Sequence, residues 1–436
     1  MKVELEGAFA NLALQGAFKQ HPLSERDRAF VTALVQGTTR HIVELDRKIA
    51  EHSSRPLAKM TPALRAVLRC AFFQLTYMDD IPVSAVVNTA VQIARKTGHE
   101  GSARFTNGVL RSFKSKADSK PDHSVPEWLV ERWKRNFGDE ETELLLKYSQ
   151  EIPVLTLRTN ESAITPEGLM RIFTDKGMKV EQGKLVPSCL NIVDRGPVGG
   201  PVSKLPGYAE GLFAVQDEAS AFVALVVSPT PGQLVLDLCA APGGKSLHMA
   251  ELMENKGRIV AADVNQKRLN LIAPERRRLG LTNIETVQAD GRYFPSQVMF
   301  DSILIDAPCT GTGVINRRSD LSQRRKKEDL EELIAIQRDL LSHASRLLRP
   351  GGILVYSTCS MEPEENRQNI EEFLRTHHEF RSEPLWDFLN TEIIGLWKEE
   401  SHWAETSEQI EAGMLQLLPS RHSTSGFFIS RLRRES

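Results

Sequence analysis

The spacing of apolar residues changes along the chain, from a helical pattern at the start to alternating strands and helices in the second half. In the first part, apolar residues recur at helical spacing, as at Val86 and Ala90. Ser84 is placed to cap the start of that helix and Gly98 to end it. Few strand signals interrupt this part, which therefore predicts a compact helical bundle.

A polar segment with two prolines, Lys114–Pro126, follows the bundle and predicts a linker. An aromatic-rich helix is then expected over residues 128–137, a strand over 154–160 and a helix over 165–176. Residues 177–210 hold short strand-like pieces broken by Gly and Pro. This middle part predicts a small α/β subdomain.

Strands and helices alternate from about Gly211 onward. The predicted strands are Leu234–Leu238, Arg258–Ala262, Asn283–Gln288, Ser302–Ile305 and Ile353–Tyr356. The clearest helix runs from about Glu328 to Leu348 and stops at R-P-G-G. A late strand over 426–431 is expected to pair antiparallel, at an edge or in a final hairpin. This alternation is typical of a Rossmann-like, mostly parallel sheet, which binds ligands at the carboxyl ends of its strands.

The length of 436 residues is too great for one ordinary domain. We expect a helical domain over 1–118, a linker over 119–126, a small α/β subdomain over 127–210 and the larger α/β domain over 211–436. No apolar stretch is long enough to cross a bilayer and the start lacks a signal peptide, so we expect a soluble cytoplasmic protein with no membrane partner.

The net charge of −2 predicts no global attraction to nucleic acid, so any such contact needs a local basic patch. One strongly cationic segment, residues 317–327, follows the fourth predicted strand. Its candidate phosphate-binding residues are Arg317, Arg318, Arg324, Arg325, Lys326 and Lys327. The runs at 276–278 and 431–434 are weaker candidates, and for the first of them we favour a solvated helix face.

Five cysteines without any C-x-x-C spacing argue against a disulfide framework and against a metal site. Cys309, in D-A-P-C-T-G-T-G-V, and Cys359, in V-Y-S-T-C-S, each follow a predicted buried strand. If those strands are parallel, both thiols face one crevice, which favours covalent chemistry over packing. A helix expected after Cys359 would lower the pKa of its thiol. For Cys70, Cys189 and Cys239 we favour a structural role.

The first α/β strand runs into C-A-A-P-G-G-K-S, residues 239–246, and then into a helix. Gly244, Lys245 and Ser246 fit the end of a phosphate-binding P-loop, but Cys239 stands where that motif requires its first Gly. The other interpretation is an S-adenosylmethionine loop, which needs an acid about twenty residues further on for the ribose hydroxyls. Aspartates end the next three strands at positions suited to such a cofactor: Asp263, Asp290 and Asp306.

At these motifs the chain resembles the RsmB/Sun (Fmu) family of bacterial 16S ribosomal RNA cytosine-5 methyltransferases. C-A-A-P-G-G-K, D-A-P-C-T-G-T-G, T-C-S followed by P-E-E-N, and Q-D-E-A-S at 216–220 match that family's motifs. R-D-R-A-F-V-T-A-L-V-Q-G, P-V-S-A-V-V-N-T-A-V and F-T-N-G-V-L-R resemble its NusB-like RNA-binding helical domain. The resemblance covers nearly the whole chain.

The resemblance implies methylation of carbon 5 of one cytosine in small-subunit ribosomal RNA, with S-adenosylmethionine as the methyl donor. Carbon 5 is a poor nucleophile until a thiolate adds to carbon 6, so the reaction is covalent catalysis. The family's nucleophile maps to Cys359 and its release cysteine to Cys309, with Asp306 beside them. Its cofactor contacts map to Cys239, Ala240, Ala241, Pro242, Gly243, Gly244, Lys245, Asp263, Asp290 and Asp306.

Three positions depart from the family pattern. R-S-D at 318–320 stands where many relatives have H-P-D, Gln323 stands at a Trp position, and Ser425 replaces the Asp of a late D-G-F-F element. These changes bear on target-base contacts or site choice rather than on the reaction. Two other classes stay open, a P-loop-like nucleotide hydrolase and a non-catalytic RNA-binding scaffold. We expect a monomer.

Overall fold

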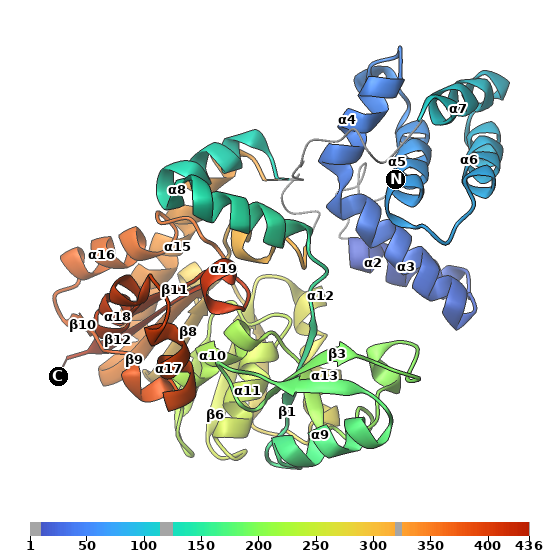
Figure 1. The fold of residues 1–436 in the computed structure, drawn as a ribbon. Helices are drawn as coiled ribbons and strands as arrows, with labels where there is room; N and C mark the ends of the chain where they lie inside the picture. Colours follow the sequence, from blue (N-terminus) through green and yellow to red (C-terminus); the bar gives the residue numbers. More distant parts are fainter. Residues whose placement is uncertain (1–9, 114–124, 319–324, 436) are drawn as a thin grey trace. The chain divides into compact units, whose positions relative to one another are not determined.

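The computed structural model describes residues 10–113, 125–318 and 325–435 (Figure 1). These residues form two compact units. One holds the chain up to Ile152 together with a short segment that begins at Ile315. The other holds Pro153–Val314 and the chain from Arg325 onward, and it contains every strand among the described residues.

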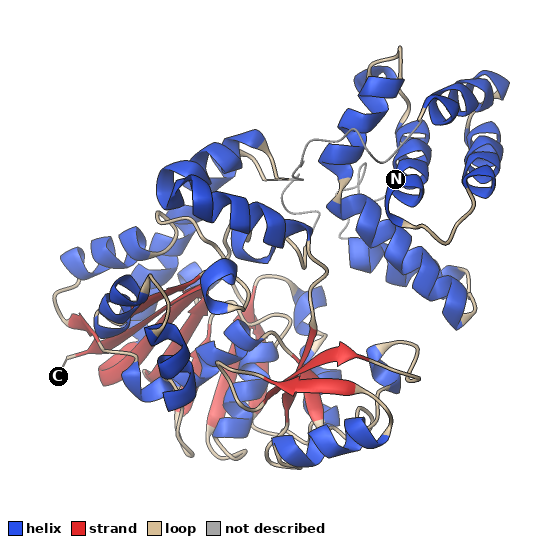
Figure 2. Cartoon of the chain, in the orientation of Figure 1, coloured by secondary structure: helices blue, strands red, loops and turns tan. Residues whose placement is uncertain are grey.

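The first unit is built from helices joined by loops (Figure 2). Its helices are α2 (Ala10–Gln20), α3 (Glu25–Arg40), α4 (Ile42–His52), η1 (Leu57–Lys59), α5 (Pro62–Tyr77), α6 (Val83–Thr97), α7 (Glu100–Ser112) and α8 (Glu127–Gln150). Buried Leu45, Phe72 and Val109 belong to one apolar core that α4, α5, α6 and α7 share. The predicted helical bundle is therefore confirmed.

Local signals explain where these helices begin and end. Thr61 caps α5 by accepting a hydrogen bond from the backbone N–H of Leu64. Gly98 ends α6 as the sequence predicts. The predicted cap at Ser84 is wrong, because Pro82 occupies the N-cap position and its fixed φ sets the helix start one residue earlier than Ser84.

A small antiparallel sheet begins the second unit. Its strands, β1 (Leu155–Thr159), β2 (Lys179–Gln182), β3 (Cys189–Asp194) and β4 (Phe213–Val215), run in the spatial order β2-β3-β1-β4. Helix α9 (Pro166–Asp175) packs its buried Leu169 and Phe173 into the core of this sheet. The strand and helix predicted for 154–176 are confirmed, since Thr165 caps α9 and Pro166 opens it.

The larger sheet has eight strands. They are β5 (Leu234–Asp237), β6 (Arg258–Asp263), β7 (Ile284–Gln288), β8 (Phe300–Asp306), β9 (Leu348–Thr358), β10 (Phe380–Ser382), β11 (Met414–Leu417) and β12 (Phe427–Arg434). The order is β10-β12-β9-β8-β5-β6-β7, with β11 also paired to β12. The five strands from β9 to β7 are parallel, which confirms the mostly parallel sheet.

The late strand pairs antiparallel as predicted; of the two expected positions, the edge is wrong, while the pairing of β12 with the preceding strand β11 fits a final antiparallel pair. β12 lies between β9 on one side and β10 and β11 on the other. Its first six residues are buried without interruption, a pattern suited to an interior strand. The long helix predicted from about Glu328 ends before R-P-G-G as expected, since α15 (Lys327–Leu347) ends at Leu347, and β9 begins at Leu348 and includes R-P-G-G.

Helices cover the larger sheet. They are α10 (Glu218–Val227), α11 (Gly244–Leu252), α12 (Gln266–Leu269), α13 (Ile272–Arg278), α15 (Lys327–Leu347), α16 (Arg367–Thr376), α17 (Thr391–Lys398), α18 (Trp403–Glu411) and α19 (Pro419–His422). On β8, Ile303 and Ile305 share a core with Leu341 and Ala344 of α15. Leu304 is also fully buried and points to the opposite face, so both faces of the sheet are covered. No helix in the described ranges has the length and apolarity that crossing a membrane requires.

Candidate active site

The strand order explains why the predicted site residues converge. β5 has β6 on one side and β8 on the other, so the order of the sheet reverses there. Parallel open sheets bind ligands at such a point, outside the carboxyl ends of the strands. The turn after β5, the acid that ends β6 and the loops after β8 and β9 therefore share one edge. Cys309 and Cys359 follow the adjacent parallel strands β8 and β9.

The turn between β5 and α11 is held close to the sheet. The backbone N–H of Ala240 donates to the carbonyl of Ala262 at 2.9 Å, and that of Gly243 donates to Ala240 at 2.7 Å. Gly243 has a φ of 108°, and a Cβ there would lie 2.7 Å from the side chain of Ile272. Only glycine fits this position. The turn then opens α11 at Gly244, with the free N–H groups of a helix start.

Two buried aspartates lie beneath this turn. Asp263 accepts hydrogen bonds from the N–H groups of Ala241 at 3.1 Å and Asn265 at 2.8 Å. Asp237 accepts one from the hydroxyl of Ser246 at 2.6 Å, and its Oδ1 has no partner among the described residues. Burial raises the pKa of Asp237 to about 7, although the Ser246 hydroxyl opposes this shift. The sequence analysis missed Asp237, which carries the same signal as its neighbours, an acid at a strand end.

Asp306 links the turn after β5 to the loops that carry Cys309 and Cys359. Its carboxylate accepts from the Nζ of Lys245 at 2.8 Å and from the hydroxyl of Ser357 at 2.9 Å. Lys245 is buried, and its ammonium also lies 5.1 Å from the ring centre of Phe427. The lysine of the near-P-loop motif is therefore directed at a carboxylate inside the protein, which disfavours the nucleotide-hydrolase interpretation.

Negative charge accumulates around the first cysteine of the turn. Burial raises the pKa of the Cys239 thiol well above its ordinary value, and the charges of Asp237, Asp306, Asp263 and Asp290 raise it further. A thiol held protonated in this way suits the structural role assigned to Cys239. The same effect shows that all four strand-end aspartates lie within electrostatic reach of one point.

Asp290 differs from the other three aspartates because it has its own cation. Arg292 binds its carboxylate, with Nη2 2.6 Å from Oδ2, and holds the pKa of Asp290 below its ordinary value. About a third of the Asp290 side chain is exposed, at 33%. Its charge is thus largely neutralised within the protein.

The two loop cysteines are in contact. The Sγ atoms of Cys309 and Cys359 lie 3.3 Å apart, and Cys309 is the more buried of the two. The hydrogen bond with Cys359, burial and nearby negative charges raise the pKa of Cys309 well above its ordinary value. Cys309 is therefore a neutral thiol whose S–H can donate to the sulfur of Cys359. The helix expected after Cys359, α16, begins only at Arg367.

The backbone around the thiols is fixed by close contacts between the loops. The N–H of Gly313 donates to the carbonyl of Cys359 at 3.0 Å, and the N–H of Gly426 donates to Gly313 at 2.9 Å. A Cβ on Gly313 would lie 2.1 Å from the carbonyl oxygen of Gly426. The hydroxyl of Thr312 accepts from the N–H of Met361 at 2.8 Å. The loops after β8 and β9 therefore behave as one assembly.

The candidate phosphate-binding residues predicted from the sequence do not form one patch within a single unit of the described structure. Arg317 and Arg318 are exposed and belong to the first unit. Arg324 lies outside the described residues, as do Asp320 and Gln323 of the family departures. Lys326 and Lys327 are exposed at the start of α15.

Other arginines considered as phosphate contacts are engaged within the second unit. The guanidinium of Arg325 donates to the carbonyls of Cys309 at 2.9 Å and Thr310 at 3.2 Å. In the run at 431–434, Arg431 is buried and pairs with Glu383, while Arg434 donates to the carbonyl of Leu348. That run therefore has a structural role in the sheet.

Comparison with known families agrees with the position of these motifs. The model of the 16S rRNA methyltransferase RsmB/F family matches residues 224–433, the NusB family matches residues 1–115, and the ferredoxin-like domain of RsmF/B-like methyltransferases matches residues 125–199. Probable ribosomal RNA small subunit methyltransferase B of Bacillus subtilis is 35% identical, over 100% of this chain and 97% of that protein. Its Synechocystis namesake is 34% identical, over 98% and 96%.

The chain belongs to the RsmB/F family of S-adenosylmethionine-dependent 16S rRNA methyltransferases. Solved structures agree with this placement. The crystal structure of PH0851 has 30% identity and a TM-score of 0.79, covering 97% of this chain and 93% of that one. NSun6 from Pyrococcus horikoshii with SFG has 26% identity and a TM-score of 0.62, covering 72% and 99%. The resemblance stated from the motifs is thus confirmed.

Proposed function

We propose that this RsmB/F member forms 5-methylcytosine at one cytosine of small-subunit ribosomal RNA, with Cys359 as the nucleophile. The observation that carries this proposal is the pair of thiols 3.3 Å apart at the carboxyl ends of β8 and β9. Covalent addition followed by elimination needs both an attacking sulfur and a group that assists its departure. We further propose that the protein acts in the cytoplasm as a monomer.

The turn after β5 fits S-adenosylmethionine better than a nucleotide triphosphate. The residues proposed to hold the cofactor are Cys239, Ala240, Ala241, Pro242, Gly243, Gly244, Lys245, Asp263, Asp290 and Asp306. Buried Asp237 has an oxygen without a partner among the described residues, as expected where a cationic or hydrogen-bonding ligand group belongs. Asp263 keeps lone pairs available for ribose hydroxyls beyond its two backbone partners. When bound, the cofactor supplies an electrophilic methyl group.

Burial and charge support different roles for the two thiols, attack for Cys359 and release for Cys309. Cys359 is the more exposed sulfur and is proposed to add to carbon 6 of the cytosine. The raised pKa keeps Cys309 protonated, so its S–H can hydrogen-bond to the Cys359 sulfur and stabilise a thiolate there, both before attack and on departure. On release, carbon 5 loses its proton to solvent, the ring double bond re-forms and the carbon–sulfur electron pair returns to Cys359.

Asp306 is proposed to act beside the target base. Its carboxylate is fixed by Lys245 and Ser357, and it ends β8, three residues before Cys309. A hydrogen bond between Asp306 and N3 of the cytosine needs a proton on the carboxyl group or on N3. The ammonium of Lys245, which contacts Asp306, is one possible donor of that proton. A base that reaches this buried edge must leave its stack, so a single-stranded or flipped cytosine is the expected substrate.

Two variants test the proposal. Cys359→Ala is expected to reduce methyl transfer by about 10³-fold or more while cofactor binding persists, because the nucleophile is lost. Cys309→Ala is expected to accumulate a covalent RNA adduct through Cys359, because departure of the sulfur is slowed. Tritium transfer from labelled cofactor, denaturing gels and mass-spectrometric mapping of modified cytosine measure these outcomes.

Cys70→Ala, in the first unit, is the matched control and should behave as wild type. Full activity of Cys359→Ala would overturn the nucleophile assignment. Absence of an adduct in Cys309→Ala would overturn the release role. RNA binding without any methyl transfer by the wild-type protein would instead support the scaffold alternative.

A further inference from the structure

The loop that carries Cys309 is clamped along its backbone by side chains that neither react nor touch the cofactor turn. Three successive carbonyls, those of residues 308–310, all accept hydrogen bonds from side chains. Gln337 of α15 donates to the carbonyl of Pro308 at 2.9 Å, and Arg325 donates to the carbonyls of Cys309 and Thr310. The clamp leaves the Cys309 side chain facing Cys359.

The other side of the loop is held by a buried carboxylate. Glu365, which has no exposed surface, accepts from the backbone N–H of Thr310 at 2.9 Å and from Gln337 at 2.9 Å. Asn369 of α16 in turn donates to Gln337 at 2.8 Å. Gln337 and Glu365 thus form the buried support of the loop. Arg325 is the partly exposed member of the clamp, with 28% of its side chain accessible.

The guanidinium of Arg325 makes its described contacts to the Cys309 loop and to Asp329. Nη2 and Nε bind the two carbonyls, and Nη1 lies 3.8 Å from the carboxylate of Asp329. An arginine can span two neighbouring carbonyls because its donors form a planar fork, which the single ammonium of lysine cannot do. Nothing comparable links the adjacent Lys327, which is exposed on α15, to the Cys309 loop.

We infer that Arg325 is a positioning residue that aims the Cys309 thiol at Cys359 for product release, and not a contact to RNA phosphate. The inference rests on the release role proposed above for Cys309. A misplacement of the thiol by about 1 Å would slow the departure of the Cys359 sulfur on the order of 10-fold to 100-fold. Binding of RNA would be affected little.

The test compares Arg325→Gln, Arg325→Lys and Lys327→Gln in the full-length protein, with Cys309→Ala run in parallel. Both Arg325 variants are expected to lower kcat about tenfold or more without raising KM, and to accumulate an RNA adduct that a second Cys359→Ala change removes. Retaining the charge in Arg325→Lys should not rescue release, because the fork is lost. Lys327→Gln should raise KM and flatten the salt dependence of binding without forming an adduct.

The outcomes separate the possible failures. If Cys309→Ala traps an adduct but the Arg325 variants do not, the positioning role is wrong while the proposed chemistry stands. If Arg325→Lys restores wild-type kinetics and Arg325→Gln only raises KM, Arg325 is a phosphate contact and the inference is overturned. If Cys309→Ala itself traps nothing, the release role fails and the inference fails with it. Thermal melting of each variant confirms that the loop change does not unfold the protein.

Discussion

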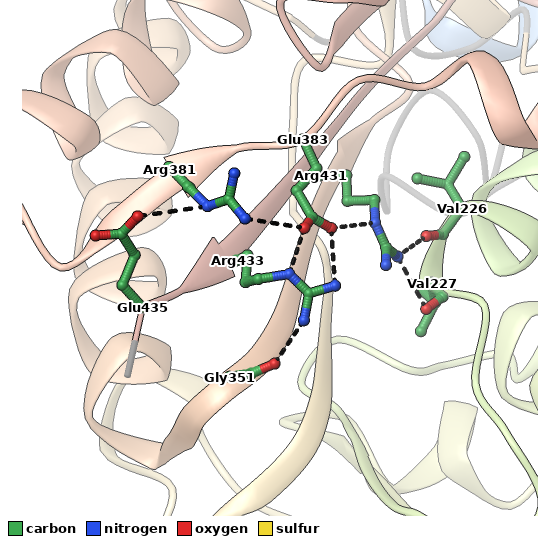
Figure 3. A network of polar contacts seen from close by, with 8 residues as sticks. All are labelled: Val226, Val227, Gly351, Arg381, Glu383, Arg431, Arg433 and Glu435. Carbon is green, nitrogen blue, oxygen red and sulfur yellow. Dashed lines mark hydrogen bonds and ion pairs between the residues drawn. The ribbon is translucent and has the colours of Figure 1, made fainter.

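Two groups of charged side chains in the second unit contrast in how completely the protein neutralises them. One lies near the antiparallel side of the large sheet and centres on Glu383 (Figure 3). The other is the set of aspartates around the turn after β5. Both include charges that are largely removed from water, but among the described residues one oxygen of Asp237 in the second group has no hydrogen-bond partner. The difference supports the proposal that the first group stabilises the fold and that the second belongs to the cofactor site.

The Glu383 network is closed. Glu383 accepts hydrogen bonds from Arg431 at 3.0 Å and from Arg433, and Arg381 lies 3.9 Å away (Figure 3). Arg431 also donates to the carbonyl of Val226 at 2.5 Å, at the end of α10. Burial alone would raise the pKa of Glu383, but the two arginines bound to it hold that pKa below its ordinary value. The network therefore ties β12 to α10 with its charges satisfied.

The aspartates of the cofactor turn are the opposite case. Burial raises the pKa of Asp237 to about 7, with the charge of Asp306 adding to the rise, although the hydroxyl of Ser246 and the ammonium of Lys245 oppose it. The ammonium of Lys245 donates its hydrogen bond to Asp306 rather than to Asp237. A buried acid with an unpartnered oxygen is costly to fold, which supports the proposal that Asp237 lies in a ligand site.

The largest expected effect is loss of the closed network's central acid. Glu383→Gln should destabilise the protein by about 3 kcal/mol, because Arg431 and Arg433 are left facing each other without an anion. Chemical denaturation measures this change. Arg381→Gln removes an exposed member of the same network and should cost less than about 1 kcal/mol. Equal effects of the two changes would contradict the claim that the closed network is structural.

Loss of an acid from the open group should affect ligand binding more than folding. Asp263→Ala is expected to weaken S-adenosylmethionine about 30-fold, near 2 kcal/mol, because the turn at Ala241 loses its anchor and the ribose its acceptor. Isothermal titration calorimetry measures the affinity. Asp290→Asn should lower affinity by less than about threefold, because Arg292 already neutralises that carboxylate. Unchanged affinity in Asp263→Ala would remove it from the cofactor site.

The pH dependence of stability gives a third comparison. Folded Asp237 keeps its proton up to about pH 7, whereas the unfolded chain releases it near pH 3.8. Between these values the folded state binds the extra proton, so the contribution of Asp237 to stability is lost as pH rises through 7. In cofactor-free protein, Asp237→Asn should show a Tm that falls about 3 °C less than wild type between pH 5 and pH 7.5. A parallel pH profile in both proteins would argue against the raised pKa.

The sequence predicts most of the parallel strands well because β5, β6 and β8 end in an aspartate after apolar residues, and the apolar part of β9 leads to Cys359. It places β5 to β9 in order along the chain, and the fixed handedness of crossovers then brings their ends together. It does not predict that β12 lies inside the sheet, because the strand carries Ser430 and three arginines, which are more typical of an edge than of an interior strand. That distinction depends on β10 and β11, which are too short to stand out.

The site shows the same limit. Cys309, Cys359 and Asp263 are visible from the sequence because they sit in motifs at strand ends. Gln337 is not, because a helical glutamine is usually solvated, and Glu365 is visible only as part of the P-E-E-N motif, without a role. Their role comes from long-range contacts to the loop at 308–310, which no local pattern encodes. The basic run at 317–327 leads to the opposite error, because every cation in it is predicted to contact RNA. The number of charges does not show that Arg325 instead donates to backbone carbonyls within the protein.

The smallest expected effect concerns a position where this chain departs from its family's pattern. Ser425 is buried, and its hydroxyl donates to Asp217 at 2.9 Å, while the other Asp217 oxygen caps α10 at Ala219. This aspartate near the cofactor turn is thus satisfied from within, unlike Asp237. Ser425→Ala should cost about 1 kcal/mol, whereas Ser425→Asp should cost more because two carboxylates would meet in a buried place. If thermal melting finds Ser425→Asp as stable as wild type, the hydrogen bond from Ser425 to Asp217 is not what favours serine here. The departure from the family pattern then needs another cause.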